Sequence, residues 1–361
     1  MKVRVGIPLP GGQLVAAARA RGYAVLFSAN AFASTYPVGH ERAGYFRRFR
    51  RPDAAQLAGL DAALDSAGYV AAAHYGGYRW SVDEYLDLVA SHSWAWWASM
   101  DMCCEPQIAQ DRPLRLLRMA ATAGLLWECS RGARSRGLPD PMPVLQGWSA
   151  AEYQQCAEWL PLLEWPELVG LGSMCRRSVG GSDGVLAILD AVDRVLPAHV
   201  KLHLFGVKST ALEQVVHHPR VASMDSMAWD VRARVARRTG RDMAFRIEHM
   251  QAWTVEQQRI VSAPPACTGL QTMLFDPATF QGIGDDEAVV LEALTLQYAD
   301  LVRSCDMEYR DAVWHSMRDG VTAIAMLRND GLNDATLARL DEELFSGLAD
   351  RVDALLHATS H

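Results

Sequence analysis

The sequence has no apolar run of the roughly 18 or more residues that a membrane-spanning helix needs. Its first residues, MKVRVGIPLP, lack the apolar core of a secretory signal peptide. Seven cysteines are scattered along 361 residues, without a CxxC pair or a Cys/His group at zinc-finger spacing. We therefore expect a soluble, reduced, cytoplasmic protein with no membrane contact, disulfide framework or metal site.

Positive charge is also scarce. The chain has 35 Lys and Arg against 42 Asp and Glu, which gives a net charge of −7. This balance excludes a generally basic surface, so any contact with nucleic acid has to be local. Because 50% of the residues are hydrophobic, the chain can bury a large core, as one barrel with an extension or as two domains.

Short apolar runs alternate with amphipathic stretches, which is the pattern of strand–helix units. We predict helices between most of the strands, with Ser81 and Ser149 as N-caps of two of them. Eight strands in series with crossover helices predict an α/β fold, a (β/α)8 TIM-like barrel, with a doubly wound open sheet as the alternative. The predicted strands are residues 3–8, 24–30, 69–74, 94–101, 143–148, 168–173, 200–206 and 221–225, and the predicted helices include 54–66, 82–90, 114–131, 150–163, 184–195 and 211–217.

The alternating pattern ends after the last predicted strand. Periodicity predicts helices at residues 291–303, 308–327 and 334–357. We expect a barrel over residues 1–242 and a helical C-terminal extension over residues 243–361, which packs on the barrel and offers a surface for a homodimer.

Polar residues and glycines collect at the carboxyl ends of the predicted strands. In a parallel barrel these ends meet at one rim, where barrel enzymes keep their active sites. Each residue alone also fits an ordinary turn, but together they favour a site. They are Ser28, Asn30, His74, Asp101, Glu105, Gln146, Gly172, Ser173, Gly206 and Asp225.

Four of these strand ends resemble a known family. PVLQGW (143–148), LVGLGS (168–173), LHLFGV (202–207) and SMDS (223–226) look like successive motifs of the tRNA-guanine transglycosylase superfamily. SMDMCCEP, GSMCRR, HLFGVK and DSMAWD bring the chain closest to its DNA 7-deazaguanine transglycosylase (DpdA-like) branch. The resemblance covers roughly residues 1–240 and implies a pentosyltransferase that replaces guanine in DNA by a 7-deazaguanine of the preQ0 type.

The resemblance also implies roles for single residues. Asp225 matches the nucleophile that attacks C1′ and forms a covalent glycosyl–enzyme intermediate, and Asp101 matches the acid that binds the base. A carboxylate can trap an oxocarbenium-like centre, and a second one accepts the N–H groups of a purine edge. The remaining substrate-binding residues implied or expected at this site are Gln146, Gly172, Asn30, Ser173 and Gly206.

The chain departs from the tRNA enzymes of the family at two places. Those enzymes have an aspartate before a Ser-Gly-Gly turn at the end of strand three. With strand three at residues 69–74, His74 occupies that place and is expected to move a proton, the alternative being a core histidine bonded to a carbonyl. The tRNA enzymes also carry a CxCxxC…H zinc site. Beyond Asp225 this chain has only Cys267, Cys305, His249 and His315, so we expect no zinc, no cofactor and a substrate other than tRNA.

Three local basic stretches are predicted to contact DNA phosphates. Residues 40–52, HERAGYFRRFRRP, interleave arginines with aromatic residues. The second stretch, residues 231–241, follows Asp225, and the third is the pair Arg176 and Arg177 after the sixth predicted strand. A solvated basic face paired with acids is the alternative. The predicted contacts are Arg47, Arg48, Arg50, Arg51, Arg176, Arg177, Arg232 and Arg234.

Two other functions stay open from the residues alone. The same barrel suits a transglycosylase acting on tRNA, a nucleoside or a small metabolite. The chain also fits a non-catalytic nucleic-acid-binding subunit that works with partner proteins of a DNA-modification system.

Overall fold

The computed structural model describes residues 1–175, 177–236 and 243–263. Residues Met1–Ala263 form one compact unit, to which all the described residues belong. Arg176, Cys267, Cys305, His315 and the helices predicted beyond residue 290 lie outside the described residues.

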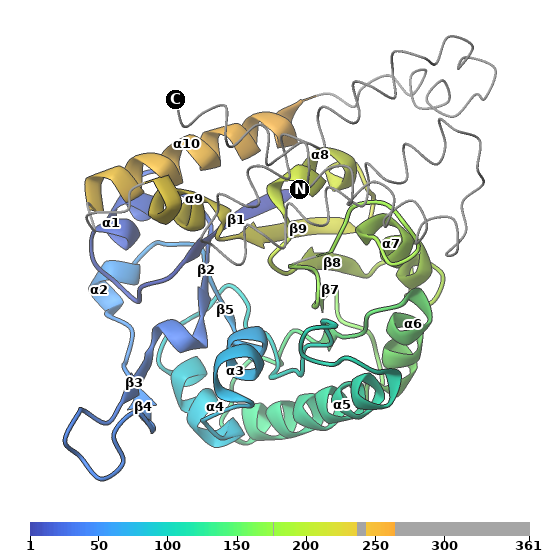
Figure 1. Ribbon diagram of the computed structural model, residues 1–361, viewed down its shortest axis with the longest axis horizontal. Coiled ribbons are helices and arrows are strands. Elements are labelled where there is room, and N and C mark those ends of the chain that lie inside the picture. Colours follow the sequence, from blue (N-terminus) through green and yellow to red (C-terminus); the bar gives the residue numbers. More distant parts are fainter. Residues whose placement is uncertain (176, 237–242, 264–361) are drawn as a thin grey trace, which may run out of the picture. The chain divides into compact units, whose positions relative to one another are not determined.

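Seven parallel strands form one curled sheet, with helices around its outer side (Figure 1). The predicted α/β class is therefore confirmed. In spatial order the strands are β5 (Ala62–Asp65), β2 (Val25–Ser28), β1 (Lys2–Ile7), β9 (Val221–Ser226), β8 (Lys201–Leu204), β7 (Leu168–Leu171) and β6 (Val144–Leu145).

The predicted strand at residues 94–101 lies between β5 and β6 without forming a regular strand. Two isolated parallel bridges hold it, one between Leu64 and Trp97 and one between Ala98 and Met142. Closure of the sheet into a complete eight-stranded barrel stays a prediction.

The third predicted strand is wrong. Residues 69–74 lie in helix α3 (Gly68–Tyr75), whereas β5 falls inside the predicted helix 54–66, of which only α2 (Ala54–Leu57) is helical. The sequence of β5, AALD, has no β-branched residue, and alanine is a strong helix former. Burial inside the parallel sheet overrides that local preference.

Helices connect successive strands along most of the chain, and two of them begin where predicted. Ser81 and Ser149 both form capping boxes, with Glu84 and Glu152 respectively, as the N-cap predictions required. Besides α2 and α3, the connecting helices are α1 (Gln13–Ala20), α4 (Val82–Ala90), α5 (Arg112–Ser135), α6 (Ala150–Trp159), α7 (Val185–Asp193) and α8 (Leu212–Val215). Helix α9 (Ala228–Ala236) follows the last strand.

Helix α10 (Met243–Ser262) packs against α1, α9 and β1. Its residues Met250 and Trp253 are buried in the same hydrophobic cluster as Val5 and Phe27 of the sheet. A second cluster fills the space around β7, β8 and β9. No helix in the described part of the chain is long and apolar enough to cross a membrane.

A β-hairpin interrupts the strand–helix alternation between β2 and α2. After the short 3-10 helix η1 (Ala29–Ala31), β3 (Ala33–Thr35) pairs antiparallel with β4 (Phe46–Phe49). The loop between β3 and β4 projects outward from the sheet and its helices (Figure 1). Because the hairpin follows the carboxyl end of β2, its base lies at the end of the sheet where the predicted site residues collect.

Candidate active site

Three aspartates lie at the carboxyl ends of the strands: Asp65 ends β5, Asp101 follows the bridged segment, and Asp225 is the last residue but one of β9. Asp101 and Asp225 are buried, with exposures of 6% and 7%. The charges of both act on Asp65, which places the three carboxylates in one electrostatic cluster. The sheet therefore brings the two predicted acids together and adds a third.

Asp225 is held by the ends of neighbouring strands. Its Oδ1 accepts the backbone N–H of Gly206 at 2.8 Å and lies 3.4 Å from Nε2 of the buried His203, without hydrogen-bond geometry. Gly206 has φ +62°, a left-handed conformation that favours glycine. The buried guanidinium of Arg4 also attracts this carboxylate. The hydrogen bond from Gly206 fixes the position of the Asp225 carboxylate.

Asp65 was missed by the sequence analysis. It starts an Asp-Ser-Ala-Gly turn at residues 65–68, which has the form of the family's aspartate before Ser-Gly-Gly, and its Oδ2 accepts the N–H of Ala67 at 3.1 Å. Burial, and then the charges of Asp101 and Asp225, raise the pKa of Asp65 to about 8. The Asp-Ser-Ala-Gly sequence carries this signal, but a third strand at residues 69–74 would put His74 in the place of Asp65.

Asp101 is the centre of a buried hydrogen-bond network. Its Oδ1 accepts from Ser66 at 2.7 Å and its Oδ2 accepts from Nε2 of Gln146 at 2.5 Å. The Tyr78 hydroxyl donates to the Asp101 carbonyl at 2.9 Å. Burial raises the pKa of Asp101, and the hydrogen bonds from Ser66 and Gln146 oppose that shift. Predicted residues 101 and 146 are thus in direct contact.

The other end of the Gln146 amide is fixed by Ser173. The Ser173 hydroxyl donates to Oε1 of Gln146 at 2.7 Å, accepts the N–H of Cys104 at 2.7 Å and lies 3.1 Å from Oε2 of Glu105. A hydroxyl has one proton to donate, so Glu105 has to donate to Ser173 if every group is satisfied. Burial raises the pKa of Glu105, in agreement with a protonated acid.

Gly172 allows Gln146 to approach the neighbouring strand. A Cβ atom at Gly172 would lie 2.2 Å from Nε2 of Gln146, so any side chain there would displace the amide. The next residue, Ser173, has φ +53°, which is unusual for a residue other than glycine. Such a conformation persists where surrounding contacts require it, as the contacts with Gln146 and Glu105 do here.

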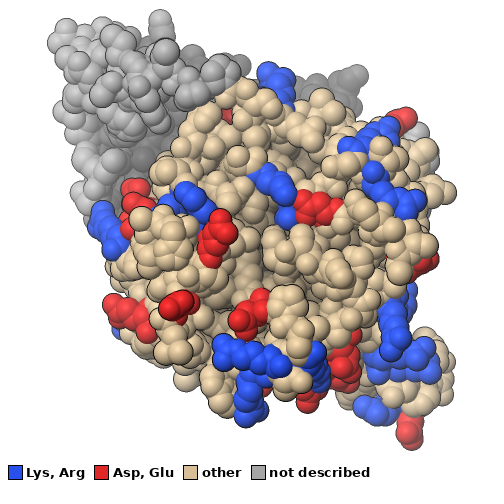
Figure 2. Space-filling view, turned by 180° about the vertical axis from the view of Figure 1, so that it is seen from behind, with Lys and Arg blue, Asp and Glu red and all other residues tan. Residues whose placement is uncertain are grey.

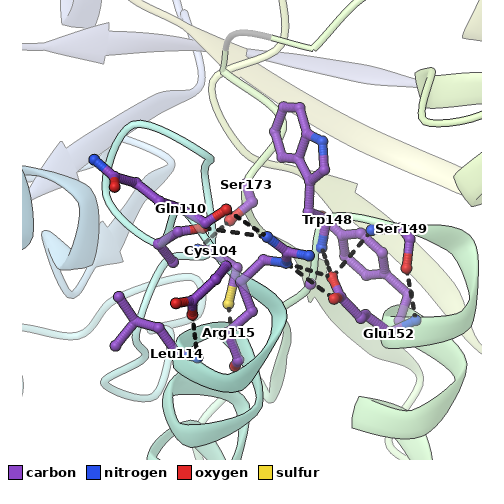
Figure 3. A network of polar contacts seen from close by, with 12 residues as sticks. Cys104, Gln110, Leu114, Arg115, Trp148, Ser149, Glu152 and Ser173 are labelled. Atoms are coloured by element: carbon purple, nitrogen blue, oxygen red, sulfur yellow. Dashed lines mark hydrogen bonds and ion pairs between the residues drawn. The ribbon is translucent and has the colours of Figure 1, made fainter. Parts of the chain in front are cut away.

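The loop after β6, which carries Gln146, is held in place by contacts with helices α5 and α6. Figure 3 shows Arg115 reaching from α5 to Glu152 on α6, with Nε 2.9 Å from Oε1 of Glu152. Oε2 of Glu152 also accepts the backbone N–H groups of Trp148 at 2.8 Å and of Ser149 at 3.1 Å. This buried carboxylate therefore ties the Gln146 loop to two helices.

Two predicted site residues lie outside this network. His74 is exposed in the last turn of α3, because residues 69–74 are helical. Asn30 lies in η1 at the carboxyl end of β2, where its Oδ1 accepts the hydroxyl of Tyr75 at 3.0 Å.

Arg177 is buried, with an exposure of 2%, and does not face solvent as a phosphate contact would. Its guanidinium donates to the carbonyls of Trp148 and Asp183 and lies 4.1 Å from the centre of the Trp148 ring. The prediction of Arg177 as a phosphate ligand is therefore not retained, since its donors already stabilise the loop.

The other described arginines of the basic stretches are exposed. Arg232 and Arg234 on α9 pair with Glu256 at 4.0 Å and Asp230 at 3.2 Å. Arg47, Arg48, Arg50 and Arg51 lie on β4 or directly after it and face solvent. In the described part of the chain no group of three or more His, Cys, Asp or Glu is placed to hold a metal ion.

No curated protein matches the sequence. Residues 35–293 match the family described as DeoxyPurine in DNA protein A, DpdA, which is the branch that the strand-end motifs resemble. That match spans most of the chain and includes the ends of β5, β6, β7, β8 and β9. The chain belongs to the DpdA family.

Proposed function

We propose that this protein replaces guanine in DNA by a 7-deazaguanine of the preQ0 type through a covalent glycosyl–aspartate intermediate. Membership of the DpdA family implies a transglycosylase-like enzyme with DNA as its substrate. The observation that carries the finer proposal is the cluster of Asp65, Asp101 and Asp225 at one end of the parallel sheet.

The different surroundings of Asp225 and Asp65 support different roles. Asp225 accepts the backbone N–H of Gly206 and is attracted by the positive charge of Arg4. Both interactions suit a carboxylate that acts as a nucleophile. Asp65, with its pKa raised to about 8, holds a proton near neutral pH and suits a general acid. When two neighbouring acids have different environments, the one that keeps its proton usually acts as the general acid. We therefore assign the proton transfer to Asp65 in place of His74.

The proposed exchange has two balanced steps. In the first, a carboxylate oxygen of Asp225 forms a bond to C1′, the bond from C1′ to N9 of guanine breaks, and Asp65 gives its proton to the departing base. In the second, N9 of the deazapurine bonds to C1′, Asp225 leaves as a carboxylate, and the N9 proton passes to Asp65. Two displacements on one carbon retain the configuration of the nucleoside.

Asp101 and Gln146 are proposed to bind the base. Each Asp101 oxygen has a second lone pair beyond the bond it already accepts, so the carboxylate can take further N–H donors from a guanine-type edge. Because Gln146 and Ser66 lock that carboxylate in place, its position is set before the base arrives. The proposed substrate site also includes four residues around these groups: Gly172, Ser173, Gly206 and Asn30.

We also propose that residues 94–101 supply the eighth strand of a closed barrel. The bridges from Leu64 to Trp97 and from Ala98 to Met142 support this, because they join the two outer strands of the seven-stranded sheet through one segment. A closed ring would keep Asp101 opposite Asp225 across the same mouth.

Trapping the covalent intermediate tests the proposal. Unmodified protein, incubated with DNA in the absence of any deazapurine and then denatured rapidly, should carry a DNA adduct. In a separate assay it should exchange labelled guanine into DNA. Asp225→Ala should lose the adduct and at least about a thousandfold of the rate, as removal of a nucleophile does. Asp140→Ala, at an exposed aspartate, is the control.

Each other outcome identifies an alternative. An adduct with tRNA in place of DNA would identify a tRNA enzyme. DNA binding with no adduct and no exchange would identify the non-catalytic subunit of a modification complex.

A further inference from the structure

We propose that the β3–β4 hairpin is a DNA-opening arm. Its arginines hold phosphates, while its tip, the loop of residues 36–45, enters the duplex and separates the strands next to the target nucleotide. The inference deepens the proposed function and rests on it. An enzyme that reacts at C1′ under a stacked, paired base has to take that base out of the duplex first.

The hairpin starts where the proposed chemistry is. β2 ends at Ser28, beside the Asp65 end of β5 in the sheet, and the chain passes through Asn30 before β3 begins. The loop between β3 and β4 then projects away from the sheet (Figure 1). DNA held by this arm would present a nucleotide to the aspartate cluster.

Positive charge is concentrated on this arm although the chain is acidic overall. Between residues 33 and 51 the sequence has five arginines and one acid, Glu41. Lys and Arg side chains gather on the lobe at the lower right of Figure 2, where the hairpin projects in that view. Phosphates attract such a cluster, and counterion release makes the attraction strong. The five exposed arginines are Arg42, Arg47, Arg48, Arg50 and Arg51.

The tip exposes one apolar and one aromatic side chain to water. Val38 is 100% exposed and Tyr45 is 65% exposed. Tyr36 stacks on His40 with ring centres 4.5 Å apart, and the guanidinium of Arg42 lies 5.0 Å from the Tyr36 ring. Proteins that kink or open DNA insert apolar side chains of this kind between base steps, flanked by cationic groups.

The arm is anchored well enough to act as a wedge. Phe46 and Phe49 pack on Trp80, with ring centres 5.7 and 5.2 Å away. Near the tip, Nη1 of Arg79 donates to the carbonyl of Gly44 at 2.7 Å. An arm held in this way loses little conformational freedom when it binds, so more binding energy remains to unstack the bases.

The first test measures duplex opening directly, without base exchange. The probe is a short duplex with 2-aminopurine beside the target guanine, since this base fluoresces more strongly when it is unstacked. We expect the unmodified protein to raise the fluorescence and the double variant Val38→Gly, Tyr45→Ala to lose about 80% or more of that rise. Leu163→Ala is the matched control, because Leu163 is fully exposed in the loop before β7, at the opposite end of the sheet.

The second test compares base exchange on two DNAs. On fully paired DNA we expect the tip variant to be at least about tenfold slower than the unmodified protein. On the same sequence with an unpaired bubble at the target, we expect equal rates. If the tip variant opens and modifies paired DNA as well as the unmodified protein does, the hairpin does not open DNA, and the proposed function is unaffected. Tip-dependent opening without exchange on either DNA would support the arm and refute the proposed function.

The arginines have a test of their own. Each phosphate contact adds about 0.9 to the slope of log affinity against log salt concentration for duplex DNA. We expect the double variant Arg47→Gln, Arg48→Gln to reduce that slope by about 2, and Arg194→Gln, at the opposite end of the sheet, to leave it unchanged. Equal slopes for the two variants would overturn the arm as a phosphate-binding element.

Discussion

Nε2 of Gln146 donates to Oδ2 of Asp101 at 2.5 Å, while Ser173 holds the opposite end of the same amide. The amide therefore has one orientation, with its donor towards the acid that we propose to bind the base. That orientation depends on the absence of a side chain at Gly172, beside the amide.

Replacing Gly172 should disturb this pair directly. Gly172→Ala places a Cβ atom 2.2 Å from Nε2 of Gln146, so we expect a higher KM for the base and a loss of about 1–3 kcal/mol in stability. Exchange kinetics and chemical denaturation measure the two effects. The control is Gly180→Ala, where an added Cβ meets no atom within 4 Å. Equal kinetics for both variants would contradict the proposed contact with the base.

Asp65 should make both activity and stability depend on pH. Its folded-state pKa of about 8 lies above the ordinary value of 3.8, so the folded chain holds the proton over a range in which the unfolded chain releases it. The group therefore has no effect on stability below about pH 4, and it lowers stability progressively as the pH rises from there towards 8.

Asp65→Asn should remove this dependence. Only the parent loses stability as the pH rises from 5 to 8. We therefore expect the stability of the variant relative to the parent to be greater at pH 8 than at pH 5 by on the order of 2–4 kcal/mol, measured by denaturation at both values. The unmodified enzyme should lose exchange activity above about pH 8, where its general acid is deprotonated, and the variant should be nearly inactive throughout. A variant with the parent's stability profile would argue against a protonated Asp65.

Glu105 should tolerate loss of its charge but not of its hydrogen bond. If the acid is protonated and donates to Ser173, the amide of Glu105→Gln can replace it, and we expect stability within about 1 kcal/mol of the parent. Glu105→Ala leaves a buried cavity and removes that donor from Ser173, at a cost of about 2–4 kcal/mol. If the glutamine variant were as unstable as the alanine variant, the carboxyl would have to be ionised.

Glu152 and Asp140 provide a matched comparison of buried and exposed ion pairs. Glu152→Ala leaves Arg115 and two backbone N–H groups without their acceptor in a buried place, and we expect a loss of about 2–4 kcal/mol. Asp140→Ala breaks the exposed pair with Arg134 and should cost less than about 1 kcal/mol. Thermal denaturation of the two variants checks the difference, and equal losses would mean that the Glu152 contacts do not brace the Gln146 loop.

Much of the fold could be predicted because its strands are buried apolar runs with polar ends. Residues 168–171 and 221–226 are strands where the sequence indicated them, and helix 82–90 begins at its capping serine. The strand at 62–65 was hidden because two alanines and a leucine carry no strand preference that local reasoning can detect. Only the sheet around them, an effect of distant parts of the chain, makes them a strand.

The site residues could likewise be predicted only where the sequence indicated the strand that carries them. Asp101, Gln146 and Asp225 lie at the ends of apolar runs that the sequence indicated, and so they could be named in advance. Asp65 depended on the hidden strand and was missed. Arg177 looked like a phosphate ligand because a pair of arginines gives no sign of burial, whereas the fold uses its guanidinium to bind carbonyls and an aromatic face.

The uneven pairing of the sheet has a consequence for substrate tolerance. Asp225 belongs to a strand of six residues paired on both sides, whereas Asp101 and Gln146 follow a segment held by two single bridges and a strand of two residues. The proposed nucleophile thus lies on a strand paired on both sides, and the groups that we propose to bind the base follow the most sparsely paired part of the sheet. We therefore expect Asp101 and Gln146, which their mutual hydrogen bond holds together, to move as a pair when bases with different substituents bind, while Asp225 keeps its position relative to the sugar.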